Sequence, residues 1–368
     1  MKRLLTPLLC LLLLAGCAPR PAKPAEPTDP IDTLMDSMTT EEKVGQLFYA
    51  RCPDVEAVED VQNYHLGGYI LFKRDTNDKS ADQLRSYIRA FQDAARIPLL
   101  IGVDEEGGTV ARVSANPQLR AERFSSPRGL FERGGMDAIL KETAEKDALL
   151  LDLGFNLNMA PVADVCTDPD AFIYDRTFGE DGLATANYVE QVVAQMSEDN
   201  MGSVLKHFPG YGHNLDTHTG MAVDSRTLEE FRKSDFLPFQ FGLEGAQGKA
   251  AILVSHNFIA AVDKELPASL SPAVHQLLRE ELNFDGVVMT DDLAMEGANL
   301  QGRSAAVLAL RAGNDLVLTS NHRRDIAEVL AALDSGTLSA ETVDAACRRV
   351  LVWKEALGLL GSPEPEKT

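Results

Sequence analysis

The sequence predicts a single (β/α)8 barrel with no second α/β sandwich domain. Short apolar runs alternate with segments of helical period, and this alternation continues without a change of composition from residue 31 to the end of the chain. An open doubly wound sheet is the alternative, but no GxGxxG follows the first run and no GxxxxGK[ST] occurs. Each of eight apolar runs is expected to form one parallel strand: 47–50, 68–72, 99–103, 156–162, 203–205, 250–254, 286–289 and 315–318.

The segments between and after these runs have the period of helices. We expect helices over 184–199, 272–282 and 304–312, and two closing helices over 322–333 and 340–358. Near the start, Thr39 and Glu42 have the spacing of a capping box, which predicts that a helix begins there. Eight strand–helix units in about 330 residues are the expected size of such a barrel.

The N-terminus predicts export and a lipid anchor. Lys2 and Arg3 precede an apolar stretch over 4–14 that is too short to span a bilayer, which is typical of a signal peptide over 1–17. The stretch ends in Leu-Ala-Gly-Cys17, which resembles a bacterial lipobox. In that resemblance the lipidated Cys17 becomes the first residue of the mature protein, outside the cytoplasm on a bacterial membrane. An ordinary secretory signal with an incidental cysteine is the alternative.

Residues 18–30 hold five prolines and almost nothing apolar, so we expect an extended linker before the barrel at 31–368. The remaining cysteines, Cys52, Cys166 and Cys347, are far apart and form no CxxC motif, which favours buried free thiols over a metal or disulfide framework. The net charge of −21 disfavours binding of nucleic acid or anionic lipid. We expect a monomer that needs no cofactor.

Polar side chains follow the predicted strands, where the mouth of a barrel lies. Asp104 follows the third run, Arg176 the fourth, Lys206 and His207 the fifth, and Asp291 with Asp292 the seventh. Adjacent carboxylates at a strand end point in different directions, so one can face the mouth while the other caps a turn. The alternative is that both aspartates only start a helix.

The segment from Lys206 to His218 concentrates ionisable groups. A lysine beside a histidine at a strand end needs a carboxylate or a ligand if it is buried. Further along, Asp216 and His218 are two residues apart, so the carboxylate can orient an imidazole that transfers a proton near neutral pH. A solvent-exposed loop and a metal site are the alternatives, and the absence of HExxH spacing disfavours the metal.

The motifs KHFPGYG and DTH, together with VDEEGG, DRTFGED and TDDLAMEGA, resemble the β-N-acetylglucosaminidase branch of glycoside hydrolase family 3. The resemblance runs in order from residue 31 to about 320 and implies a (β/α)8 barrel with a retaining mechanism. It implies that Asp291 is the nucleophile and that Asp216 and His218 supply the acid/base. It also implies the residues that hold the sugar: Asp104, Arg112, Arg176, Lys206 and His207.

Two positions depart from the familiar motifs. Tyr211 stands where histidine is usual, and the loop before Asp216 is one residue shorter. Glu105 stands where glutamine is common, and we expect it to add charge near the mouth.

The expected activity is retaining hydrolysis of terminal β-linked N-acetylglucosamine from peptidoglycan fragments or chitooligosaccharides. A β-N-acetylglucosaminide phosphorylase and a β-glucosidase are the enzymatic alternatives. A carbohydrate-binding lipoprotein on an inactive barrel is the alternative from another class.

Overall fold

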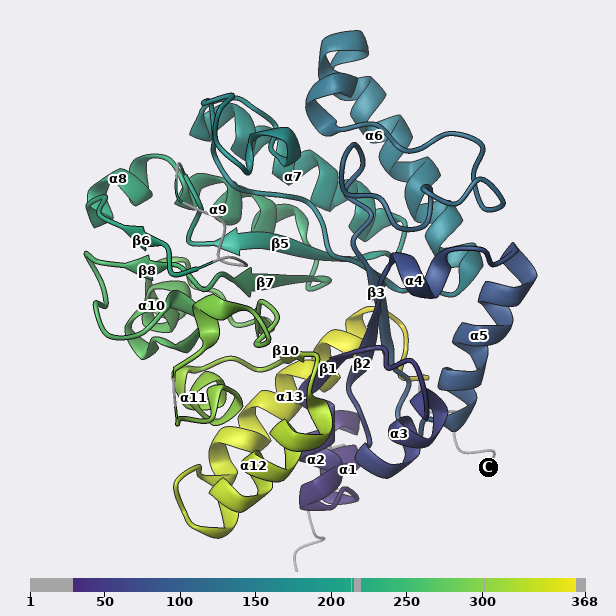
Figure 1. Ribbon diagram of the computed structural model, residues 1–368, viewed down its shortest axis with the longest axis vertical. Coiled ribbons are helices and arrows are strands. Elements are labelled where there is room, and N and C mark those ends of the chain that lie inside the picture. Colours follow the sequence, from purple (N-terminus) through teal and green to yellow (C-terminus); the bar gives the residue numbers. More distant parts are fainter. Residues whose placement is uncertain (1–28, 213, 215–219, 301, 362–368) are drawn as a thin grey trace, which may run out of the picture.

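The computed structural model describes residues 29–212, 214, 220–300 and 302–361. Within them, eight parallel strands form one sheet in the order β10-β1-β2-β3-β4-β5-β7-β9 (Figure 1). The two end strands meet through a parallel bridge between Met289 and Leu316, which nearly closes the sheet into a barrel. The predicted single (β/α)8 barrel is therefore confirmed.

Each of the eight strands coincides with or overlaps one predicted apolar run. Their bounds are β1 Phe48–Arg51, β2 Gly68–Leu71, β3 Leu100–Val103, β4 Leu157–Asn158, β5 Gly202–Phe208, β7 Ala250–Val254, β9 Val288–Thr290 and β10 Val317–Thr319. The sequence did not predict a second, two-stranded sheet formed by β6 (Val223–Asp224) and β8 (Phe258–Ile259). Strands of two residues are too short to show an alternating pattern.

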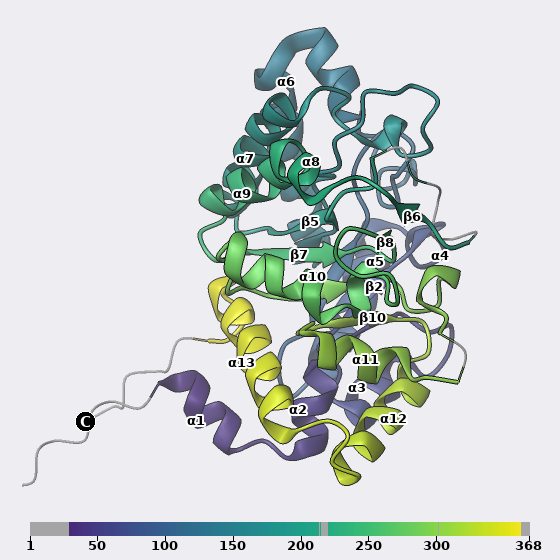
Figure 2. The same cartoon turned by 90° about the vertical axis from the view of Figure 1, so that its left-hand side faces the viewer.

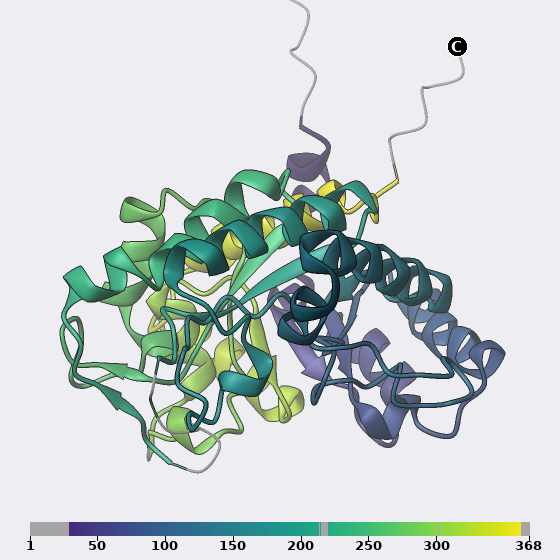
Figure 3. The same cartoon turned by 90° about the horizontal axis from the view of Figure 1, so that it is seen from above.

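Helices surround the sheet (Figures 1 and 3). Their bounds are α1 Pro30–Asp36, α2 Thr40–Gln46, α3 Ala57–Tyr64, α4 Lys73–Thr76, α5 Ala81–Ala94, α6 Pro127–Leu153, α7 Gly182–Glu198, α8 Leu228–Lys233, α9 Phe236–Gly245, α10 Pro272–Gln276, α11 Ala305–Ala312, α12 His322–Asp334 and α13 Ala340–Ala356. Thr39 and Glu42 form the predicted capping box at the start of α2. The predicted helix over 272–282 is α10 followed by a π-helical turn, Leu277–Glu281.

The first and last helices lie side by side, because α1 and α2 both pack against α13 (Figure 2). The first helix begins at Pro30, with the side chain of Asp29 as its N-cap. The predicted signal peptide, Cys17 and nearly all of the predicted linker lie outside the described residues. In the part of the chain that the structure describes, no helix combines the length and the apolar character needed to cross a membrane.

Two apolar layers lie on either side of the sheet. The larger fills the space between strands and helices, and the smaller fills the inside of the barrel with residues such as Tyr49, Leu100, Met289 and Trp353. Because side chains occupy the interior, the barrel is a packed core and ligands have access only at its ends. The free cysteines Cys52, Cys166 and Cys347 are all buried, as expected.

Candidate active site

A cavity of about 390 Å³ lies at the carboxyl ends of the strands. It brings together all the predicted site residues that the structure describes: Asp104, Arg112, Arg176, Lys206, His207 and Asp291. They come from the ends of β3, β5 and β9 and from the loops after β3 and β4, so segments up to 187 residues apart in sequence share one mouth. The predicted acid/base pair, Asp216 and His218, lies outside the described residues.

Lys206 occupies the floor of the cavity and is held between two carboxylates. Its Nζ lies 2.7 Å from Asp104 Oδ1 and 2.6 Å from Glu106 Oε1. Burial by itself lowers the pKa of a lysine, but the two carboxylates more than offset that effect and raise the pKa of Lys206 above its usual value. Lys206 is therefore a fixed positive charge, able to donate to substrate oxygens throughout the neutral pH range.

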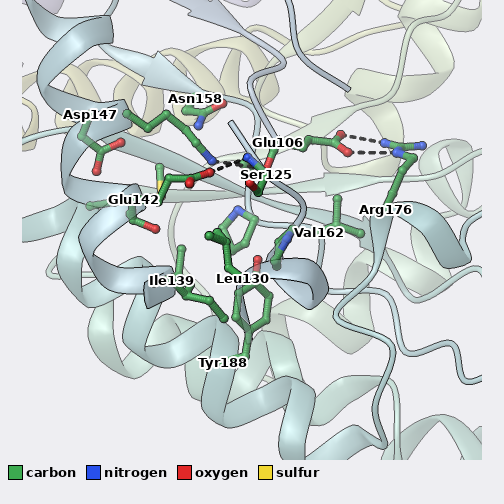
Figure 4. A pocket seen from close by; sticks show the side chains of 17 residues that line it. Glu106, Ser125, Leu130, Ile139, Glu142, Asp147, Asn158, Val162, Arg176 and Tyr188 are labelled. Carbon is green, nitrogen blue, oxygen red and sulfur yellow. Dashed lines mark hydrogen bonds and ion pairs between the residues drawn. The ribbon is translucent and has the colours of Figure 1, made fainter. Parts of the chain in front are cut away.

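Glu106 links Lys206 to Arg176. Its carboxylate accepts two hydrogen bonds from Arg176, from Nε at 3.0 Å and from Nη2 at 2.8 Å (Figure 4). Burial alone would raise the pKa of Glu106, but Arg176 and Lys206 together hold it well below the usual range. The same interaction raises the pKa of Arg176 against the opposing effect of burial. Glu106 was not among the predicted site residues, although it lies in the VDEEGG motif.

His207 is oriented by Asp164, which lies beyond the predicted strand of β4. Asp164 Oδ2 lies 2.7 Å from His207 Nδ1 and also accepts the His207 backbone N–H at 3.1 Å. The other carboxylate oxygen accepts the backbone N–H of Tyr211 at 2.7 Å. A hydrogen bond from Nδ1–H leaves Nε2 directed toward Arg176 Nη2, 3.3 Å away. Asp164 thus fixes both the imidazole and the start of the segment that follows β5.

The two adjacent aspartates after β9 have different surroundings. Asp292 accepts hydrogen bonds from the backbone N–H groups of Ala294 and Ser320 and from the Ser320 hydroxyl, so its carboxylate closes the turn. Asp291 lines the cavity, and its backbone N–H donates to the carbonyl of Val254 in the neighbouring strand β7. His256 supports this turn through Nε2, which lies 3.0 Å from the Asp292 carbonyl oxygen.

Glu105 does not act as expected. Its side chain is fully buried and accepts hydrogen bonds from the backbone N–H groups of Arg112, Val113 and Ser114 and from the Ser114 hydroxyl. It therefore holds the loop that carries Arg112 and does not line the cavity. The expectation that Glu105 adds charge near the mouth is wrong, because the loop folds back over this carboxylate.

Two guanidinium groups line the cavity without an acidic partner among the described residues. Arg112 follows β3, and Arg51 ends β1, where it lies over the ring of Phe72 with 4.6 Å between Cζ and the ring centroid. Arg51 Nε is buried and has no hydrogen-bond partner in the described part of the chain. Buried donors of this kind are expected to be satisfied by ligand or water.

The chemistry available at this mouth is that of acids, bases and hydrogen bonds. It combines a carboxylate at a strand end with fixed cations and a histidine, the groups that orient a polyhydroxylated ligand. Among the described residues, no group of three or more histidine, cysteine, aspartate or glutamate side chains has the arrangement needed to hold a metal ion.

Comparison with known proteins defines the family. The glycosyl hydrolase family 3 N terminal domain matches residues 39–352. The chain therefore belongs to glycosyl hydrolase family 3.

Two curated relatives extend this match. The chain is 36% identical over 277 residues to a β-hexosaminidase of Idiomarina loihiensis, covering 73% of this chain and 80% of the relative. It is 34% identical over 285 residues to a β-hexosaminidase of Haemophilus influenzae, covering 75% and 78%.

Solved structures show the same fold. A family 3 β-N-acetylglucosaminidase from a Paenibacillus species superposes with a TM-score of 0.81 at 29% identity over 90% of this chain, which spans 65% of the length of that structure. A β-N-acetylhexosaminidase from Beutenbergia cavernae has a TM-score of 0.75 at 28% identity, covering 86% of this chain and 99% of that one.

Proposed function

We propose that this protein is a retaining β-N-acetylglucosaminidase that uses Asp291 as its nucleophile. The observation that carries the proposal is the position of Asp291, at the end of β9 in the same cavity as Lys206, Arg176 and His207. The β-hexosaminidase names of the relatives at 36% and 34% identity support the hydrolytic activity, and the solved family 3 β-N-acetylglucosaminidase at 29% identity supports the choice of sugar.

The proposed reaction has two steps at C1 of the sugar. In the first, an Asp291 carboxylate oxygen bonds to C1 while the bond from C1 to the leaving oxygen breaks, and His218 gives that oxygen a proton. In the second, His218 takes a proton from water as the water oxygen bonds to C1, and the Asp291 carboxylate is released. Asp216 orients His218 in both steps, and the sugar keeps its β configuration.

The cations at the floor hold the sugar for this displacement. Lys206 and Asp104 bind neighbouring hydroxyl groups as donor and acceptor, while Arg176, His207 and Arg112 bind the remaining oxygens of the ring and the acetamide. Because Glu106 and Asp104 already neutralise Lys206 and Arg176, binding an uncharged sugar there leaves no isolated charge in the closed site.

The first experiment measures products with three donor sugars. We expect free N-acetylglucosamine from an aryl β-N-acetylglucosaminide, from chitobiose and from peptidoglycan fragments, at the same rate with and without phosphate. If N-acetylglucosamine 1-phosphate is the main product, the enzyme is a phosphorylase and not a hydrolase. Faster turnover of the matching aryl β-glucoside would mean that the enzyme is a β-glucosidase and does not prefer the acetamido sugar.

We propose further that the enzyme acts outside the cytoplasm, anchored to a bacterial membrane through a lipid on Cys17. The motif Leu-Ala-Gly-Cys17 after a short apolar stretch supports this, and the proline-rich segment that follows would hold the barrel away from the membrane. Labelled fatty acid should enter the full-length protein and leave Cys17→Ser unlabelled and released from membranes. Equal labelling of the two proteins would contradict the anchor.

A further inference from the structure

Phe172 lies at the rim of the active-site cavity and has no place in the core. Its side chain lines the cavity and is 39% exposed. The residues beside it are packed differently: Ala171, Ile173 and Tyr174 join Cys166 and Tyr211 in a small apolar cluster. The flanking residues therefore anchor the backbone while the Phe172 ring is left facing the mouth.

Three aromatic rings lead from the floor of the cavity to this rim. The rings of His207 and Tyr211 are 5.1 Å apart and nearly perpendicular, at 83°. The rings of Tyr211 and Phe172 repeat that geometry, at 5.1 Å and 80°. His207 and Tyr211 are both buried, and Asp164 holds each of them by a backbone hydrogen bond. Phe172 thus rests against a fixed ring and not on a freely moving loop.

Tyr211 connects this rim, through the sequence, to the residues proposed as the acid/base pair. Tyr211 directly precedes the segment that carries Asp216 and His218 in the sequence. If that segment supplies the proton to the leaving oxygen, then the leaving group lies on its side of the cavity, outward from the sugar held at the floor. Among the described residues that line the cavity, Phe172 is the one large hydrophobic side chain that is exposed, and it lies against Tyr211.

We propose that Phe172 is a stacking platform for the leaving-group sugar and makes the enzyme selective for N-acetylglucosamine linked to a second pyranose ring. The inference rests on the proposed function and goes beyond it by assigning a subsite outside the bond that is cleaved. A pyranose presents an apolar face of C–H groups, and covering the Phe172 ring with that face removes apolar surface of both partners from water. A leaving group without a ring cannot make this contact.

The test compares two substrates that both leave through an alkyl oxygen, chitobiose and methyl β-N-acetylglucosaminide. For Phe172→Ala we expect kcat/KM to fall roughly fivefold with chitobiose, which corresponds to about 1 kcal/mol, and to stay nearly constant with the methyl glycoside. Phe172→Tyr should keep the preference for chitobiose, because it retains the ring. The thermal midpoint of each variant establishes that the protein is folded.

Phe131 provides a matched control. It is also 39% exposed and packs edge-on against a phenylalanine, Phe178, with centroids 5.0 Å apart, but it does not line the cavity. Phe131→Ala should leave the ratio of the two kcat/KM values unchanged. An equal fall for both substrates in Phe172→Ala, or no fall for either, overturns the platform. If the wild-type enzyme cleaves neither substrate, the proposed function itself fails, which is a distinguishable result.

Discussion

Among the residues that the structure describes, two lysines are buried, and they are held in opposite ways. Lys206, at the mouth, is 3% exposed and lies between the carboxylates of Asp104 and Glu106, which raise its pKa. Lys354, in α13, is fully buried, and its Nζ donates to the amide oxygen of Gln46 at 2.7 Å. Burial lowers the pKa of Lys354 to about 7.

The difference shows that the groups in contact with a buried lysine, and not its burial alone, determine whether it is charged. Carboxylates in contact keep Lys206 charged where a sugar needs a donor, and a neutral amide leaves Lys354 close to losing its proton. The mouth is therefore organised electrostatically before substrate arrives, which is the usual way in which sites with buried charges act on a ligand. Lys354 contributes to packing and weakens the fold whenever it is protonated.

Removing the shared carboxylate at the mouth should have the largest effect. In Glu106→Gln, Lys206 and Arg176 lose a common negative partner in a buried site, and removing one partner of a buried pair costs about 3–5 kcal/mol. We expect kcat/KM for an aryl β-N-acetylglucosaminide to fall at least about 100-fold, together with a lower thermal midpoint.

The neighbouring Glu105→Gln is the control for that change. It is the same substitution one residue earlier, in a side chain that holds a loop and does not line the cavity. We expect a smaller fall in kcat/KM, about tenfold, because the new NH2 group faces backbone N–H donors of the loop that carries Arg112, while Lys206 and Arg176 keep their shared carboxylate. Equal losses in the two variants would show that the pairing at Lys206 has no special importance.

The next effect concerns the orientation of His207. The two carboxylate oxygens of Asp164 accept hydrogen bonds from three N–H groups. In Asp164→Asn, an NH2 group replaces one of these oxygens and faces an N–H donor, with which it cannot form a hydrogen bond. Hydrogen bonds to charged groups contribute about 1.5–3 kcal/mol, so we expect a loss of about 10- to 100-fold in kcat/KM, with a changed pH profile. Asp175→Asn, an exposed carboxylate in the same loop region, should leave both the rate and the profile as in the wild type.

The smallest effect, a gain in stability, tests the other lysine. The pKa of Lys354 is about 7 in the folded protein and near 10.5 when unfolded, so the unfolded chain binds more protons between these values and stability rises with pH there. Below pH 7 the whole cost of charging Lys354 is present. Lys354→Met removes that cost but also the hydrogen bond to Gln46.

We therefore expect Lys354→Met to raise the free energy of unfolding by about 1–3 kcal/mol at pH 6, with the gain shrinking toward zero by about pH 10. Denaturant titrations at several pH values measure this. Lys233→Met, at an exposed position, should show no such pH dependence. A gain that is the same at pH 6 and pH 10 would mean that packing and not charge explains it.

The sequence predicted the barrel well because its strands are short, apolar and separated by helical periods. It also placed Asp104, Lys206 and Asp291 at strand ends, which parallel topology brings to one mouth. The sequence did not predict which side chains form hydrogen bonds and ion pairs with one another. Glu105 and Glu106 are adjacent and chemically alike, yet one holds a loop and the other joins two cations. The path of the chain after β3 decides between them, and no local pattern encodes that path.

Phe172 and Arg51 are two further residues whose surroundings could not be predicted from the sequence. Phe172 lies in an irregular segment between β4 and the short 3-10 helix Tyr174–Arg176, so no period marks its exposure. Arg51 directly follows apolar strand residues, and only the assembled barrel shows that its Nε is buried against Phe72 with no hydrogen-bond partner among the described residues.

The proposed mechanism requires that Asp291 forms a covalent bond to the sugar. The direct measurement is mass spectrometry of the enzyme after reaction with a fluorinated β-N-acetylglucosaminide, whose glycosyl-enzyme hydrolyses slowly. We predict one sugar added to the protein and located, after proteolysis, on Asp291, with no adduct in Asp291→Asn. An adduct on Asp292 or Asp104, or a product released with inverted α configuration and no adduct, would rule out Asp291 as the nucleophile.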